Sequence, residues 1–146
     1  MKRYLIFAAL GPFIGGFILL LATTYTSGYW THTDWSEVAK LFVVFAKTLQ
    51  YSYLFGVLPT LMIAAVDDIV FHVRSVRPVL RMLIVGAIAF VATEVMYGSR
   101  GPDSGVAQFV LYGLVGFVPA SVSSWLAHEA IDEPAAPAPE PVATSE

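Results

Sequence analysis

Long segments without a charged side chain limit this chain to very few folds. Residues 106–127 are 22 consecutive residues without Asp, Glu, Lys or Arg, and residues 4–24 are another 21. A helix needs about 20 apolar residues to cross the hydrocarbon core of a bilayer, which is about 30 Å thick. Because lipid offers the backbone no hydrogen-bond partner, segments of this kind predict membrane-spanning helices.

Two further segments reach spanning length, with charges at or near their ends. Residues 48–66 stop at a pair of aspartates, and residues 79–97 hold Arg81 near the start and Glu94 near the end. Only 13% of the chain is charged, against about 25% in soluble proteins. The sequence therefore predicts an all-α, polytopic membrane protein with a bundle of four transmembrane helices.

The start of the second span has two interpretations. Asp34 followed by Glu37 fits a helix N-cap with an acid three positions on, so helix can begin near Trp35. A helix over residues 35–66 would be about 48 Å long, which exceeds the hydrocarbon core. Either residues 35–46 lie along the outer interface, or the helix tilts and projects from the membrane.

Charge is divided unevenly between the body of the chain and its C-terminal tail. Residues 1–128 hold all eight Lys and Arg, whereas residues 129–146 hold five acids and no basic side chain. The tail alternates Pro with Ala and has few large apolar side chains, so it is predicted to be disordered. No basic surface for nucleic acid emerges from this distribution.

The basic residues also predict the orientation of the chain in the membrane. Two of them precede the first span, and Arg74, Arg77 and Arg81 gather around the second connection. The first connection, residues 27–35, has none. Because Lys and Arg favour the cytoplasmic side, we expect both termini in the cytoplasm of a bacterial cell, with the inner membrane as the location.

Small residues recur at spacings that let helices pack closely, which is how helices associate in lipid. Segments two and four both read G-x-x-P-small-x-x-x-small at a constant offset of 60 positions. The predicted helix-packing residues are Gly11, Gly15, Gly56, Thr60, Ala64, Gly116, Ala120 and Ser124.

The same offset suggests an internal duplication of two helical hairpins, residues 1–70 and 75–128. The alternative is chance, because Gly and Pro are common in membrane helices. Prolines 12, 59 and 119 each release a backbone carbonyl inside a span. Helix kinks are therefore predicted at Pro12, Pro59 and Pro119.

Ionisable groups inside a membrane are costly and point to function. Glu94 is the deepest acid, and Lys47 lies in the outer part of the second span. An intramembrane ion pair between them is the functional interpretation. In the alternative, Lys47 extends to the headgroups and Glu94 faces a water-filled crevice or stays protonated.

Residues for enzymatic chemistry are not apparent. The chain has no cysteine, its serines have no partnered His and acid, and no phosphate-binding loop occurs. Asp67, Asp68 and His72 could hold a divalent metal, but charged helix ends are the commoner explanation. The prediction is a protein that is not an enzyme, with no catalytic, cofactor-binding or metal residue.

Three short motifs carry a resemblance to a known family. They are KRYL at residues 2–5 running into Gly11-Pro12, YLFGVLP at residues 53–59, and GSRGPDSG at residues 98–105. In these the chain resembles a family of small uncharacterised inner-membrane proteins of alphaproteobacteria. The resemblance implies a bacterial inner-membrane location and four helices, and it brings no known activity.

Taken together, plentiful packing motifs and scarce buried charges predict an accessory or scaffold subunit. It would associate with itself or with a larger membrane complex through its small-residue helix faces. The alternative is a small homo-oligomeric transporter or channel that uses the kinked second and fourth helices, with Lys47 and Glu94 along the route.

Overall fold

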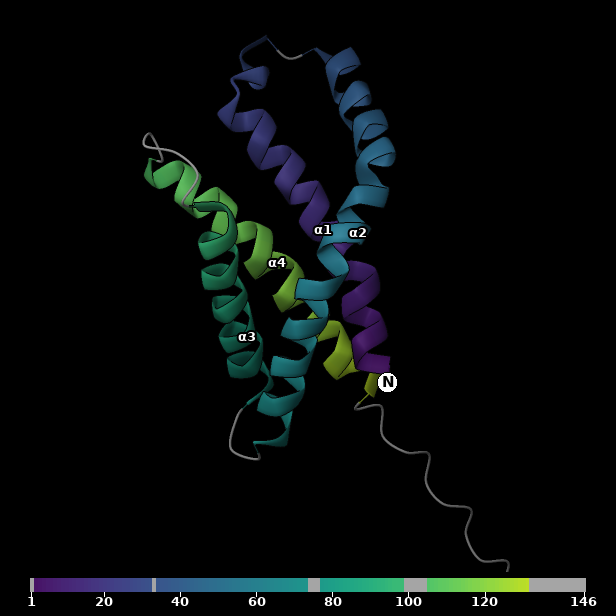
Figure 1. Ribbon diagram of the computed structural model, residues 1–146, viewed down its shortest axis with the longest axis vertical. Helices are drawn as coiled ribbons and strands as arrows, with labels where there is room; N and C mark the ends of the chain where they lie inside the picture. The colour runs from purple at the N-terminus through teal and green to yellow at the C-terminus, as the bar shows by residue number, and fades with distance from the viewer. Residues whose placement is uncertain (1, 33, 74–76, 99–104, 132–146) are drawn as a thin grey trace, which may run out of the picture.

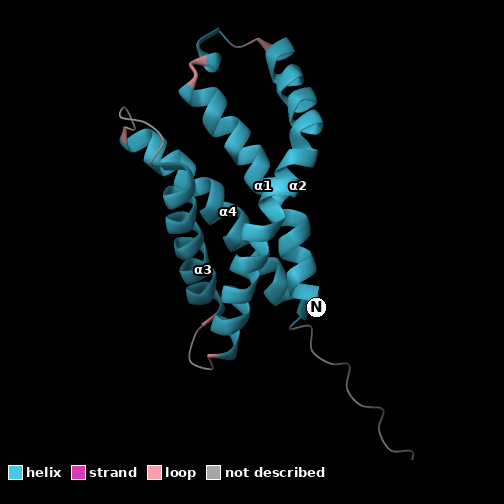
Figure 2. Ribbon diagram, in the orientation of Figure 1, coloured by secondary structure: helices cyan, strands magenta, loops and turns pink. Residues whose placement is uncertain are grey.

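The computed structural model describes residues 2–32, 34–73, 77–98 and 105–131 (Figure 1). These residues are helical or in short connections, and none of them is in a β-strand (Figure 2). The all-α prediction is thus confirmed for the described part of the chain. The elements in order are α1 (Lys2–Thr26), the 3-10 turn η1 (Tyr29–His32), α2 (Trp35–His72), α3 (Pro78–Thr93), the π-helical turn η2 (Glu94–Gly98) and α4 (Val106–Ile131).

Helix α2 is one unbroken helix of 38 residues, so residues 35–46 continue directly into the predicted second span. It begins at Trp35, with Asp34 at the N-cap position but without a side-chain capping hydrogen bond. At about 1.5 Å per residue it extends about 57 Å. All four helices, α3 counted together with η2, are long and apolar enough to cross a membrane.

Helix α4 also runs further than expected. It ends at Ile131, so residues 129–131 are helical although the tail was predicted to be disordered from residue 129. Ala and Glu are good helix formers, and the first proline of the tail comes only at position 134. The remainder of the predicted tail lies outside the described residues.

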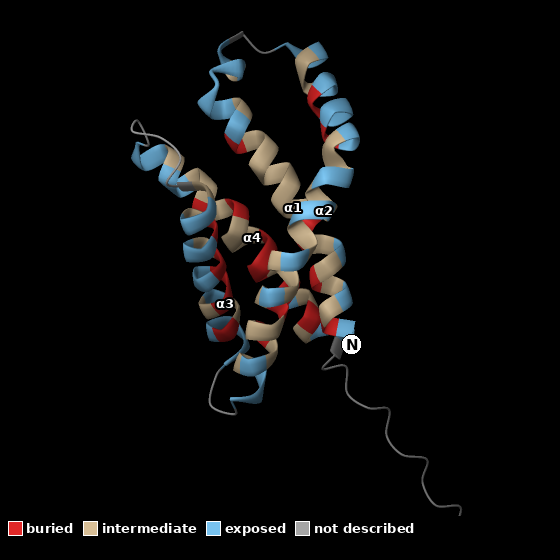
Figure 3. Cartoon of the chain, in the orientation of Figure 1, coloured by how far each residue is buried: buried red, intermediate tan, exposed pale blue. Residues whose placement is uncertain are grey.

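The four helices alternate in direction, so α1 starts, α2 ends, α3 starts and α4 ends at one end of the bundle (Figure 1). We call this the N-terminal end and the opposite one the far end. Helices α1 and α2 cross and then separate towards the far end, α3 packs along α4, and α1 packs along both α2 and α4. Buried residues gather between α1, α3 and α4, whereas much of α2 is exposed (Figure 3).

Small residues set the distance between these helices. Thr60 of α2 lies directly against Gly11 of α1, where an added Cβ would overlap it. Gly116 of α4 lies against the backbone of Ala89 in α3 in the same way. Gly15 is looser, since its added Cβ would be 3.5 Å from the carbonyl oxygen of Val115. The small-residue faces named from the sequence therefore point at neighbouring helices of the same chain.

In each of the two predicted hairpins, α1–α2 and α3–α4, a glycine of the second helix packs against the first helix. Gly56 of α2 lies against Pro12 of α1, as Gly116 of α4 lies against α3. The two halves differ in their outer contacts, because α1 packs along α4 whereas α2 and α3 meet over a shorter stretch. Pro12, Pro59 and Pro119 each lie inside a helix that continues through the proline.

Candidate functional site: a buried ion cluster

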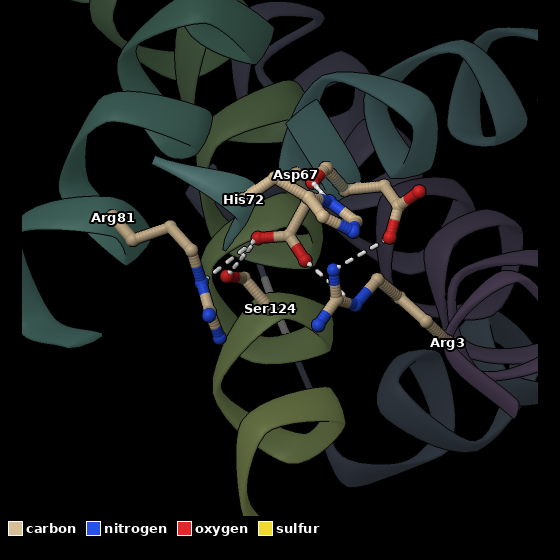
Figure 4. Close-up of polar contacts among 6 residues, drawn as sticks. Arg3, Asp67, His72, Arg81 and Ser124 are labelled. Atoms are coloured by element: carbon tan, nitrogen blue, oxygen red, sulfur yellow. Dashed lines mark hydrogen bonds and ion pairs between the residues drawn. The ribbon is translucent and has the colours of Figure 1, made fainter. Parts of the chain in front are cut away.

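One carboxylate at the N-terminal end of the bundle is in contact with all three other helices. Asp67, in the last two turns of α2, has no exposed surface. Arg3 approaches it from the first turn of α1, Arg81 from the first turn of α3, and Ser124 from the last third of α4 (Figure 4). Residues far apart in the sequence thus meet at a single side chain.

The contacts engage both oxygens of Asp67. Its Oδ2 is 3.3 Å from Nε of Arg3, and its Oδ1 is 3.4 Å from Nε of Arg81. The hydroxyl of Ser124 donates a hydrogen bond of 2.5 Å to Oδ1. Arg3 also donates from Nη1 to Oδ1 of Asp68 at 2.9 Å. Two arginines therefore face two aspartates, and the cluster is neutral.

An aromatic ring covers the two guanidinium groups. The ring centroid of Phe71 is 4.2 Å from Cζ of Arg3 and 5.2 Å from Cζ of Arg81. Such cation–π contacts stabilise a desolvated cation by about 0.5–2 kcal/mol. One helical turn beyond Asp68, Nδ1 of His72 donates to the Asp68 carbonyl oxygen at 2.7 Å. These contacts fix the last turn of α2 over the cluster.

Because these side chains are buried, the stability of the cluster depends on each charge having a partner of opposite sign. Removing an ion from water costs several kcal/mol, and a partner with good geometry must offset that cost. The side chains of Arg3 and Arg81 are each only 5% exposed; Arg81 is neutralised by Asp67, and Arg3 by Asp67 together with Asp68. Asp67 is enclosed and joins three helices, although among the described residues its Oδ2 and the two arginine Nε atoms are in ion-pair contact without a hydrogen bond.

A cavity of about 200 Å³ borders the cluster on the α3–α4 side. Its lining is mostly apolar, and Ser124 is shared between the cavity and the ion cluster. The lining residues are Pro78, Val79, Met82, Ser124, Trp125 and His128.

The predicted ion pair between Lys47 and Glu94 does not form. Among the described residues, the ion pairs are those of the cluster and one between Lys40 and Glu37, at 2.6 Å. The half of α2 that carries Lys47 is held against α1, where the ring of Phe45 meets two phenylalanines, and so it lies away from α3. Lys47 is exposed, and Oε1 of Glu94 is buried and has no hydrogen-bond partner in the described part of the chain.

The two aspartates near the end of α2, which were considered as metal ligands, are engaged in ion pairs instead. Asp67 and Asp68 contact arginines instead of an open coordination position. Within residues 2–32, 34–73, 77–98 and 105–131, no three His, Asp or Glu side chains lie together as metal ligands would.

A second, exposed polar group joins η1 to α2 at the far end. The hydroxyl of Tyr29 donates a hydrogen bond to Glu37, which also contacts Lys40. Donating to the Glu37 carboxylate raises the pKa of Tyr29, because loss of the phenol proton would place two negative charges together. The contact ties the α1–α2 connection to the start of α2.

The sequence reasoning missed the partnership of Arg3 and Arg81 with Asp67. A signal was present, because both arginines lie at the predicted cytoplasmic end of a predicted span and Asp67 ends another predicted span on the same side. Three charges at equal depth in an apolar bundle are best neutralised by one another. Ser124 was predicted as a packing residue, and the structure adds its hydrogen bond to Asp67.

A model of a family of unknown function, DUF5413, matches residues 1–133. The chain belongs to this family. The match contains all four helices and the complete ion cluster, so both lie within the family's own domain. No curated protein and no solved structure matches the chain.

Proposed function

We propose that this DUF5413 protein is embedded in the inner membrane of a bacterium, crosses it four times and keeps both termini in the cytoplasm. Four apolar helices of spanning length support the embedding. Lys2, Arg3, Arg77 and Arg81 all lie at the N-terminal end of the bundle, which is the side that the positive-inside rule assigns to the cytoplasm. The resemblance to alphaproteobacterial inner-membrane proteins agrees with this location.

Reporter fusions test the orientation directly. A reporter active only in the cytoplasm is expected to work when fused after Ile131 and to fail when inserted at Gly28 in the α1–α2 connection. A periplasmic reporter at the same two positions should give the opposite pattern. Periplasmic activity after Ile131 would contradict the proposed orientation.

Within that membrane, the proposed role is that of a non-enzymatic accessory or scaffold subunit, in a homo-oligomer or a larger complex. The observation that carries the proposal is the Asp67 cluster, which joins the ends of four helices and neutralises their buried charges. A bundle fixed in this way is a rigid body with an apolar exterior. The small-residue faces are used inside the chain, so association must use the exposed surface, of which α2 offers a large part.

Native mass measurement after extraction in a mild detergent tests the accessory role. The expected result is one assembly of defined stoichiometry, heavier than the single 15.8 kDa chain. The same sample in a denaturing detergent should separate into its component chains, which identifies any second protein. Recovery of the single chain alone, from membranes extracted at native abundance, would contradict the proposal.

One observation favours the alternative of a small oligomeric transporter or channel. Glu94 is the first residue of the π-helical turn η2, and its buried Oε1 has no hydrogen-bond partner among the residues that the structure describes. Turns of this kind are frequent at functional sites. Ion flux into proteoliposomes that is abolished by Glu94→Gln would favour transport over the accessory role.

A further inference from the structure

Two ionisable side chains in the apolar parts of the bundle have no partner within the described residues. Lys47 is exposed on α2 and makes none of the hydrogen bonds or ion pairs found there. Glu94 makes none either, and its Oε1 is enclosed. Both have apolar exposed neighbours, namely Val43 and Val44 beside Lys47 and Val91 and Val95 beside Glu94. A charge surrounded by hydrocarbon in this way is costly until it is paired.

The two side chains lie at similar depth in the bundle. Gly16 of α1 lies against Ser52 of α2, and the adjacent Gly15 lies near the backbone of α4 at Val115. The next residue of α4, Gly116, lies against Thr93 of α3. These contacts place Ser52 and Thr93 at about the same level.

From that level, both charges lie towards the far end. Lys47 is five residues from Ser52, or about 7.5 Å, and Glu94 is one residue from Thr93, or about 1.5 Å. The two residues therefore differ in depth by about 6 Å, and the flexible four-carbon side chain of lysine can span that difference. The two charges are opposite in sign and similar in depth, and only their lateral positions keep them apart within one chain.

We propose that Lys47 of one copy pairs with Glu94 of a second copy of this chain. Copies inserted in one membrane share an orientation, so the lysine and the carboxylate of neighbouring copies stand at matching depth. In a dimer with two-fold symmetry the pair forms twice, because Lys47 of each copy contacts Glu94 of the other copy. The proposal rests on the proposed membrane embedding and association, and it names the surface and the partner.

Cysteine cross-linking tests the contact, since the chain itself has no cysteine. Lys47→Cys and Glu94→Cys chains, carrying different tags, are co-expressed and oxidised in native membranes. A disulfide-linked species containing both tags is expected, and each variant expressed alone should give little. The control pairs Glu94→Cys with Met62→Cys, another exposed α2 position fifteen residues nearer the N-terminal end, and should not cross-link.

Charge reversal tests the energetics of the same contact. Lys47→Glu and Glu94→Lys each place like charges together, and each is expected to weaken dimerisation in a mild detergent about tenfold or more. The double variant restores the opposite charges and should recover the dimer. Neither residue has a polar partner among the described residues of its own chain, and thermal unfolding of the three variants reports whether the fold is intact.

The outcomes separate this inference from the proposed function. Absence of the mixed disulfide, or a double variant that is no better than the single ones, overturns the pairing. If the chain then still elutes with another protein, the accessory role stands and only the Lys47–Glu94 pairing fails. If it elutes as a lone monomer, both proposals fail.

Discussion

Replacement of Asp67 by asparagine is expected to lower the free energy of unfolding by about 3–5 kcal/mol. The change keeps the size of the side chain and removes its charge. Arg81 would then be a buried cation without a carboxylate partner, and Arg3 would keep only Asp68. Breaking one side of a buried ion pair costs more than the pair itself contributes, because the remaining charge stays out of water.

Thermal unfolding in detergent, followed by circular dichroism, measures this effect. The matched control is Asp68→Asn, the same chemical change one residue away, at a side chain that is 40% exposed. Water screens that position, so a loss of at most about 1 kcal/mol is expected. If the two variants were equally destabilised, Asp67 would not be the centre of the cluster.

The sequence predicted the helices well because their signal is local. Twenty-two uncharged residues determine a helix of spanning length whatever the neighbouring segments do. The beginning of α2 at Trp35 was also readable, from Asp34 and Glu37 ahead of an apolar run. What composition did not show was the end of α4, since short helical extensions depend on packing at the helix end.

Neighbour relations between helices were harder to predict. Lys47 and Glu94 were matched by depth, and the contacts of the bundle place them at similar depth. Their separation follows from lateral order, because α2 at Lys47 is packed on α1 through aromatic rings. Depth can be counted along a sequence, whereas the identity of the adjacent helix depends on contacts between residues far apart in the chain.

The same limit explains why the ion cluster was missed. Arg3 and Arg81 were read as markers of orientation, which treats each charge as facing the cytoplasm alone. In the structure these two residues are among the most buried of the chain, and a carboxylate of a third helix lies between them. A basic residue that orients a helix can therefore also pack inside the bundle, provided that an acid lies at the same level.

Close packing of α3 on α4 leads to the second large expected effect. Gly116→Ala is expected to destabilise the fold by about 1–3 kcal/mol, although alanine favours helix more than glycine does. The added Cβ would lie 2.8 Å from the backbone carbon of Ala89 and still closer to its carbonyl oxygen. A backbone group cannot rotate aside as a side chain can, so the two helices would have to move apart.

Gly15→Ala provides the matched control for this substitution. It makes the same change inside another helix, where the new Cβ would be 3.5 Å from the carbonyl oxygen of Val115 and 3.7 Å from Cγ of Pro119. Those are ordinary contact distances, so the higher helix propensity of alanine should leave stability unchanged or raise it by up to about 1 kcal/mol. Thermal unfolding of both variants under one condition measures the difference. Equal melting temperatures would mean that helices α3 and α4 do not approach as closely at Gly116 as the structure has them.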